Sequence, residues 1–187
     1  LARLEQPLLL TLYTDHSSQA EENKKLLSEL SALCDKISYE IQPATEKRKN
    51  TIVISDGQGK EKGMNFHGVP GGHEFNSFIL ALYNAAGPGQ DVGQALQQQI
   101  ETIAAPIHMD IAVSLSCTMC PDLVAAAERI AAENAHVTVD VYDLQYYPEM
   151  QKKYNIMSVP CLIVNEKEVH FGKKGVGDLL KIIAGLG

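Results

Sequence analysis

The sequence predicts an α/β protein made of two fused units of similar pattern, and three observations lead to this prediction. Short apolar segments typical of strands are interleaved with amphipathic segments typical of helices along the whole chain. The strongest turn signal, Gly87-Pro88-Gly89, lies near the middle of the 187 residues. The segments on its two sides repeat in a similar order, so we expect a first unit over 1–88 and a second over 89–187.

The composition is that of an ordinary soluble globular protein, with 45% hydrophobic and 21% charged residues. No apolar run is long enough to cross a membrane, and a net charge of -7 without a basic tract argues against nucleic acid as the main partner. Four cysteines are too few for a secreted disulfide scaffold, which favours a reducing compartment and one working pair. Because the first residue is Leu1, the absence of a signal peptide carries little information.

In the first unit, the segment LLLTLY is followed by several possible N-caps, so a helix should begin near Ser18 or Ala20 and run to about Asp35. Leucines three and four residues apart give this helix one buried face, on which we also expect Leu33 and Cys34. Strands are predicted at 8–13, 37–41, 51–55 and 62–67, and a second helix should bury Phe75, Phe78, Ile79 and Leu82.

A connecting helix from about Gln90 to Ala104, ended by Pro106, should lead into the second unit. In that unit we predict strands at 107–114, 137–142, 161–165 and 168–171, and helices at 121–134, 148–154 and 176–184.

The two units can be laid over one another. LLLTLY matches MDIAVS, ISYEI matches VTVDV, NTIVI matches PCLIV, and the segment from Gly68 matches the segment from Gly172. The first unit has Asp15-His16-Ser17-Ser18-Gln19 in place of a cysteine pair, and Asn50 in place of Pro160. We therefore expect the first copy to be redox-inactive.

The second unit carries Cys117 and Cys120, two residues apart, between a predicted strand and a predicted helix. Each unit taken alone is compatible with a ferredoxin-like or a thioredoxin-like fold. A Cys-x-x-Cys at this place, followed some forty residues later by Val159-Pro160 and then a Gly-rich turn before the last helix, favours the thioredoxin-like arrangement. The predicted fold is two fused thioredoxin-like folds of the three-layer α/β/α type.

Disulfide exchange needs one exposed thiol that ionises near neutral pH and a second thiol close by. Cys117 fits the attacking role because it lies at the start of a helix, where backbone N–H groups favour a thiolate, and Cys120 fits the buried, resolving role. Pro121 suits the first helical turn. We expect Pro160 to be cis and Val159, Pro160, Thr118 and Met119 to form the substrate-binding surface.

The alternative for the pair is half of a zinc site, which would need a second Cys or His pair at ligand spacing. His108, His136 and His170 show no pairing in the sequence, so no metal is expected. Cys161, next to Pro160, is either a third redox thiol or, as we favour, a core residue, and Cys34 is expected to be core.

The exchange also needs a group that accepts the proton of Cys120. Asp140 and Asp143 are the nearby acids of the same unit, and neither matches convincingly the place where thioredoxin-like folds carry their carboxylate. Glu74, in Gly72-His73-Glu74-Phe75 of the first unit, is the other candidate. On sequence alone it is better explained as a first-turn acid stabilised by the helix dipole.

Over essentially its whole length the chain resembles the N-terminal domain of the flavoprotein subunit of bacterial alkyl hydroperoxide reductase. The resemblance rests on the two thioredoxin-like halves, the cysteine-free first half and two stretches of sequence. These are Gly71-Gly72-His73-Glu74-Phe75 leading into Ser77-Phe78-Ile79-Leu80-Ala81-Leu82, and Ser114-Leu115-Ser116-Cys117 before Cys120-Pro121-Asp122. Thr118-Met119 departs from the His-Asn of the family motif, which bears on the redox potential but not on the mechanism class.

The resemblance implies a thiol-disulfide oxidoreductase, the disulfide reductase component of an NADH-dependent alkyl hydroperoxide reductase system. Electrons would pass from a FAD- and NADH-binding portion of the same polypeptide, through Cys117 and Cys120, to the disulfide of a two-cysteine peroxiredoxin. The resemblance also implies that Glu74 is an acid lent by the inactive half, and that the whole protein is a homodimer of the bacterial cytoplasm.

The chain has no Gly-x-Gly-x-x-Gly motif, so we expect it to bind neither FAD nor NADH itself and place both beyond Gly187. Two other functions stay open at this point. One is a stand-alone, general protein disulfide oxidoreductase, and the other is a module whose first half docks partners.

Overall fold

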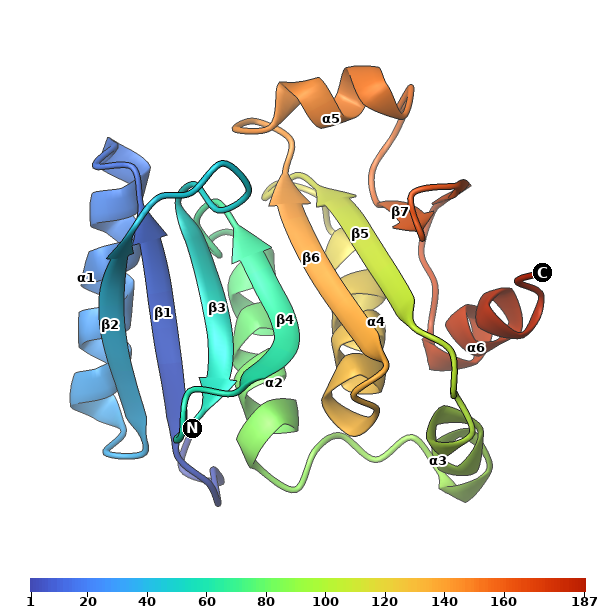
Figure 1. Ribbon diagram of the computed structural model, residues 1–187, viewed down its shortest axis with the longest axis horizontal. Helices are drawn as coiled ribbons and strands as arrows, with labels where there is room; N and C mark the ends of the chain where they lie inside the picture. Colours follow the sequence, from blue (N-terminus) through green and yellow to red (C-terminus); the bar gives the residue numbers. More distant parts are fainter.

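Alternating apolar side chains form one continuous sheet of eight strands, and the structure, a computed structural model, describes residues 1–187 (Figure 1). The elements of the first half are β1 (Leu8–Thr14), α1 (Ser18–Leu33), β2 (Ile37–Pro43), β3 (Thr51–Asp56), β4 (Glu61–His67) and α2 (Glu74–Ala86). The helix α3 (Gln94–Glu101) follows. The second half contains β5 (Ile107–Val113), α4 (Cys120–Glu133), β6 (Val137–Asp143), α5 (Pro148–Lys153), β7 (Cys161–Val164), β8 (Glu168–Phe171) and α6 (Val176–Ala184).

The two halves have the same strand order and the same strand directions. The order across the sheet is β2-β1-β3-β4-β6-β5-β7-β8, and in each half the first strand pairs in parallel with the second and antiparallel with the third. The halves join where β4 pairs in parallel with β6, from Met64↔Val139 to His67↔Tyr142. The predicted pair of fused thioredoxin-like folds is confirmed, and the two share one sheet.

Strand register fixes how the halves correspond. Leu10 is opposite Tyr39 and Ile54, and Met109 is opposite Val139 and Val164, so Leu10 and Met109 are equivalent. The sequence alignment of LLLTLY with MDIAVS was therefore wrong by two residues, because both strands are apolar at alternate positions and a shift of two preserves that pattern. The other strand matches, ISYEI with VTVDV and NTIVI with PCLIV, agree with the register.

Most helices cover one face of the sheet. Figure 1 shows α1, α2 and α4 side by side behind the strands, and the main core lies between them and the sheet. The opposite face is covered only over the second half, where Met150 of α5 packs with Ala112, Cys161 and Ile163. The third layer is thus reduced to α5, and the sheet face in front of β4 and β6 carries polar side chains.

Three local expectations were wrong. The connecting helix is shorter than 90–104, because it begins only after Gly93, whose φ of 81° does not continue a helix, and it ends at Glu101. Leu33 is 78% exposed since α1 ends there and turns away from the core, and Phe75 is 45% exposed at the first turn of α2. None of the helices combines the length and the apolar character that a membrane-spanning segment requires.

Candidate redox site

The two cysteines that the sequence singled out form a disulfide between the end of β5 and the start of α4. Cys117 lies in the turn before the helix and is partly exposed, whereas Cys120 is the first residue of α4 and is completely buried. The helix therefore starts one residue earlier than predicted, with Pro121 in its first turn.

The start of α4 directs a backbone donor at the outer sulfur. The N–H of Cys120 donates to Sγ of Cys117 over 3.1 Å, and the N-cap residue Met119 offers no side-chain hydrogen bond to the helix. An N–H group at a helix start stabilises negative charge on its acceptor. The sulfur thus occupies the place where a capping oxygen would otherwise lie.

Val159 and Pro160 lie beside this sulfur. The peptide bond between them is cis, the geometry that the sequence predicts, and Sγ of Cys117 is 3.9 Å from the carbonyl oxygen of Val159. The N–H of Val159 makes no hydrogen bond within the chain. Cys117 and Val159, which are 42 positions apart in the sequence, are thus neighbours in the fold, and the N–H of Val159 beside them is free to bind another chain.

The remaining residues of the predicted binding surface are solvent-exposed. Thr118 and Met119 are exposed in the turn between the cysteines. Met157, two residues before Val159, is 82% exposed and was not singled out from the sequence. The sequence feature that could have identified Met157 is its position two residues before Val159-Pro160.

Cys161 is buried on the face of β7 that packs against α5, and burial raises the pKa of its thiol to about 11. A thiol with so high a pKa is a poor nucleophile at neutral pH. Cys34 is a partly buried free thiol at the C-terminal end of α1.

Glu74, the first residue of α2, is completely buried at the junction of the halves. The residue before it donates from its N–H to the carbonyl oxygen of Leu115 over 3.0 Å, which holds this helix start against the loop that precedes Cys117. Ser77 donates to one carboxylate oxygen of Glu74, and the other has no partner. Burial raises the pKa of Glu74 to about 7, opposite to the direction that a helix dipole produces.

Glu128 was missed by sequence reasoning. It lies on α4, which packs closely against α2, is 3% exposed and has one carboxylate oxygen without a partner. Burial, and the charge of Glu74 in second place, raise its pKa well above the usual value. The signal was present in the sequence: α4 is apolar on nearly all sides, which indicates a buried helix.

The two acids of the second unit have other surroundings. Asp140 lies on the open face of the sheet, where its carboxylate contacts Nε2 of His67 at 2.5 Å. Asp143 accepts a hydrogen bond from the N–H of Gln145 at the end of β6, and burial raises its pKa. Neither carboxylate forms a hydrogen bond with the cysteines, and neither does that of Glu74. Oδ2 of Asp143, like one oxygen of Glu74, is buried without a partner, whereas both oxygens of Asp140 lie close to histidines.

Comparison with known proteins places this arrangement in a family context. A family model described as a thioredoxin domain matches residues 107–184. The F component of alkyl hydroperoxide reductase (AhpF) from Escherichia coli is 31% identical over 180 residues, which are 96% of this chain and 34% of that protein. The same component from Staphylococcus aureus is 31% identical over 87% of this chain and 31% of its own length. The chain therefore spans about a third of the length of these curated relatives.

Solved structures agree in fold. The NTD_N/C domain of alkylhydroperoxide reductase AhpF from Enterococcus faecalis superimposes with a TM-score of 0.90 at 32% identity, covering 97% of this chain and 93% of that one. A protein disulfide oxidoreductase from Aeropyrum pernix gives a TM-score of 0.84 at 17% identity, over 97% and 86% of the two chains. The second likeness concerns the fold alone.

Proposed function

Because this chain belongs to the family of AhpF N-terminal domains, we propose that it relays electrons between a flavoprotein reductase and a two-cysteine peroxiredoxin. The observation that carries the proposal is the disulfide itself. Its outer sulfur is partly exposed beside unpaired backbone groups, and its inner sulfur is buried at a helix start.

The relay moves two electrons in two exchange steps. In the reduced state, the Cys117 thiolate attacks one sulfur of the peroxiredoxin disulfide, forms a mixed disulfide and releases one peroxiredoxin thiolate, which takes up a proton. Cys120, once deprotonated, attacks Sγ of Cys117 and releases the second peroxiredoxin thiolate, which also takes up a proton. The Cys117–Cys120 disulfide is then closed, and the peroxiredoxin has gained two electrons and two protons.

Glu74 accepts the proton that Cys120 loses. Its carboxyl group is buried at the start of α2, which is hydrogen-bonded through the preceding residue to Leu115 in the loop before Cys117, and a pKa of about 7 lets it gain and lose a proton at neutral pH. The alternative, an acid that only stabilises the helix start, fits less well, because such acids are exposed and gain from being charged. The first unit, residues 1–88, is called the silent half from here on, and the second unit, which carries Cys117 and Cys120, the active half. The silent half therefore supplies a reacting group to the active half.

The substrate segment binds in extended form across Val159. The free N–H of Val159 and its carbonyl oxygen offer one donor and one acceptor to a strand-like segment beside Cys117. The ring of Pro160 packs against this segment, and the exposed side chains of Thr118 and Met119 contact it from the turn between the cysteines.

The same proposal includes the unit boundary, the place of the cofactors, the oligomeric state and the cellular compartment. We place the boundary between the units after Pro88, near the end of α2, and we place FAD and NADH in the part of the longer relatives that this chain does not match. The chain itself carries the redox disulfide and no Gly-x-Gly-x-x-Gly motif. The whole protein is proposed to be a homodimer of the bacterial cytoplasm.

The test uses the chain reduced with dithiothreitol, freed of reagent and mixed with an oxidised two-cysteine peroxiredoxin. Thiols are blocked at intervals and counted by mass spectrometry. Wild type should transfer two electrons per chain, Cys117→Ser should transfer none, and Cys120→Ser should stop as a mixed disulfide through Cys117. Cys34→Ser, which changes a thiol of the silent half, is the matched control and should keep the wild-type rate.

Other results would point to the other functions. If Cys117→Ser kept the wild-type rate, the relay would be wrong. Equal rates on the peroxiredoxin and on a general substrate such as insulin would favour a general disulfide oxidoreductase. Binding of the peroxiredoxin by a chain whose disulfide cannot be reduced would favour a docking module.

A further inference from the structure

A cluster of titratable and amide side chains on the open face of the sheet takes no part in the relay. Alternate residues of β4, β5 and β6 point away from the core onto this face, opposite to the valines and methionines that face α4. They line a cavity of about 520 Å³. The members of the cluster are Asn65, His67, His108, Asp110 and Asp140.

Two acids of this cluster lie directly opposite one another. Asp110 of β5 and Asp140 of β6 are register partners, and their side chains are only 10% and 15% exposed. Like charges at directly opposed positions of a sheet are destabilising, and partial burial strengthens the repulsion. Such a pair is stabilised by positive charge close to both carboxylates, which His67 and His108 supply only when they are protonated.

We propose that His108, Asp110 and Asp140 bind one divalent transition-metal ion. Nε2 of His108 is 3.0 Å from Oδ1 of Asp110 and 3.5 Å from Oδ2 of Asp140. Ligand atoms about 2.1 Å from one ion, at tetrahedral or octahedral angles, lie about 3.0 to 3.4 Å from each other. All three ligand atoms lie within 4.8 Å of one another, so small side-chain shifts bring them to one ion.

Neighbouring residues orient two of the three ligands, His108 and Asp140, as metal sites require. Nδ1 of His108 lies 2.7 Å from Oγ1 of Thr138, which leaves Nε2 for the ion. His67 contacts Oδ1 of Asp140 and leaves Oδ2 for the ion. His67 is itself fixed, since Nδ1 bonds to Thr51 over 2.9 Å and the ring stacks on Tyr142 with 4.1 Å between centroids.

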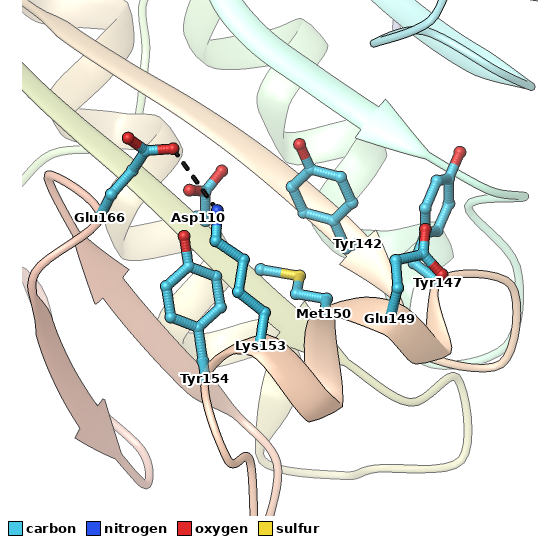
Figure 2. A pocket seen from close by; sticks show the side chains of 8 residues that line it. All are labelled: Asp110, Tyr142, Tyr147, Glu149, Met150, Lys153, Tyr154 and Glu166. Atoms are coloured by element: carbon cyan, nitrogen blue, oxygen red, sulfur yellow. Dashed lines mark ion pairs between the residues drawn. The ribbon is translucent and has the colours of Figure 1, made fainter.

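The site has room for further ligands. The cavity is lined by all three donors, and the amide of Asn65, which also lines it, donates to Oδ1 of Asp140 over 3.1 Å. Figure 2 shows Asp110 in the adjoining hollow of about 330 Å³, facing Lys153 and Glu166. Lys153 pairs with Glu166 at 3.8 Å, so this exposed lysine already has a partner other than Asp110.

The donor set selects the class of ion. One imidazole and two carboxylates, with free positions for water, suit Mn²⁺, Fe²⁺, Co²⁺ or Zn²⁺ better than a thiolate-preferring ion. Because His67 of β4 holds Asp140 of β6, a bound ion would also strengthen the junction between the two halves.

The test is titration of the oxidised, chelator-treated chain with Co²⁺ and Zn²⁺ by calorimetry, with the visible spectrum of Co²⁺ as a report on its ligands. In the oxidised form, Cys117 and Cys120 are joined in a disulfide and cannot bind the added metal ion as thiolates. One ion should bind per chain. His108→Gln should lower the affinity at least tenfold, and Thr138→Val, which removes only the partner of His108, should lower it about tenfold.

His170→Gln is the matched control, because His170 contacts Glu168 two residues away at 3.1 Å, as His108 contacts Asp110, but has no third ligand. It should bind the ion as wild type does, and circular dichroism checks that each variant is folded. The proposal is overturned if wild type binds neither ion at millimolar concentration. It is equally overturned if folded His108→Gln binds as tightly as wild type.

Discussion

The silent and the active half share their strand order, and they differ in how the first strand passes into the first helix. In the silent half, residues 15–17 make this connection, and Oγ of Ser17 accepts the N–H of Ala20 over 3.2 Å. In the active half, residues 114–119 make it, and Sγ of Cys117 accepts the N–H of Cys120 over 3.1 Å. Both helix starts need an acceptor for an unpaired N–H, and only the longer connection offers a sulfur.

The second difference lies where Pro160 of the active half corresponds to Asn50 of the silent half. Both carbonyl oxygens accept an equivalent bond, from Gly172 over 3.0 Å and from Gly68 over 2.9 Å. In the silent half, however, the amide of Asn23 on α1 donates to Oδ1 of Asn50 over 2.7 Å. A buried amide network therefore lies where the active half keeps a site open, and in the proposed relay the silent half takes part in the chemistry only through Glu74.

The largest effect is expected from replacing Glu74, and it concerns the free energy of unfolding. The folded chain raises the pKa of Glu74 from 4.5 to about 7, so it holds the proton more tightly than the unfolded chain does. As the pH rises from about 4.5 to 7, the titration of Glu74 should therefore lower the free energy of unfolding of wild type by about 3 kcal/mol, in addition to the contributions of other acids. In Glu74→Gln, this contribution to the fall in the free energy of unfolding between pH 4.5 and 7 should be absent.

Urea unfolding at pH 4, 6 and 8 measures the difference. Glu74→Gln should match wild type at pH 4 and exceed its stability at pH 8. Glu21→Gln, which changes an exposed acid in the first turn of α1, is the control and should follow wild type throughout. Parallel curves for Glu74→Gln and wild type would show that Glu74 ionises normally.

The same substitution should slow the relay. With Glu74 present, the rate of exchange should rise with pH through about 7, as the carboxylate that accepts the proton of Cys120 forms. Glu74→Gln should lose that rise and react about 10²-fold more slowly at pH 8. Stopped-flow exchange from pH 5 to 9 measures both, and an unchanged profile would reduce Glu74 to a structural residue of the silent half.

A smaller effect is expected from the amide network of the silent half. Asn23→Ala should leave Oδ1 of Asn50 and the carbonyl oxygen of Gly68 without this donor and lower the free energy of unfolding by about 2 kcal/mol. Asn76→Ala, at an exposed position of α2, should change it by less than about 0.5 kcal/mol. The rate of exchange should stay unchanged in both, since neither residue touches the cysteines, and a slower Asn23→Ala would mean that the silent half acts through more than Glu74.

The sequence predicted the parts of this comparison that depend on local pattern. Alternation gave the strands, and the spacing of Cys117, Cys120 and Pro160 gave the fold of the active half. The pairing of β4 with β6 was not predictable. The edge strands of the two halves meet there, and no residue pattern in either strand specifies which strand it pairs with. The grouping of His108 with Asp110 and Asp140 was not predictable for a related reason: Asp140 lies on a neighbouring strand, and only the register brings it close to the other two.

Glu128 was overlooked because a glutamate within a helix is usually solvent-exposed. Its burial comes from the packing of α2 against α4, a contact between the halves that the sequence of either helix does not specify. The residues that couple the two halves were thus the hardest to predict.

Glu128→Gln should have the smallest effect, and it tests which acid titrates. Burial raises the pKa of Glu128 well above its usual value, which favours the neutral form of its carboxyl group, and the amide of glutamine resembles that form in charge and size. The exchange rate of Glu128→Gln should then stay within about twofold of wild type, and its rise with pH should remain near 7, because Glu74 still titrates. Loss of that rise in Glu128→Gln, with the rise intact in Glu74→Gln, would assign the proton to the active half's own helix and leave the silent half a purely structural part.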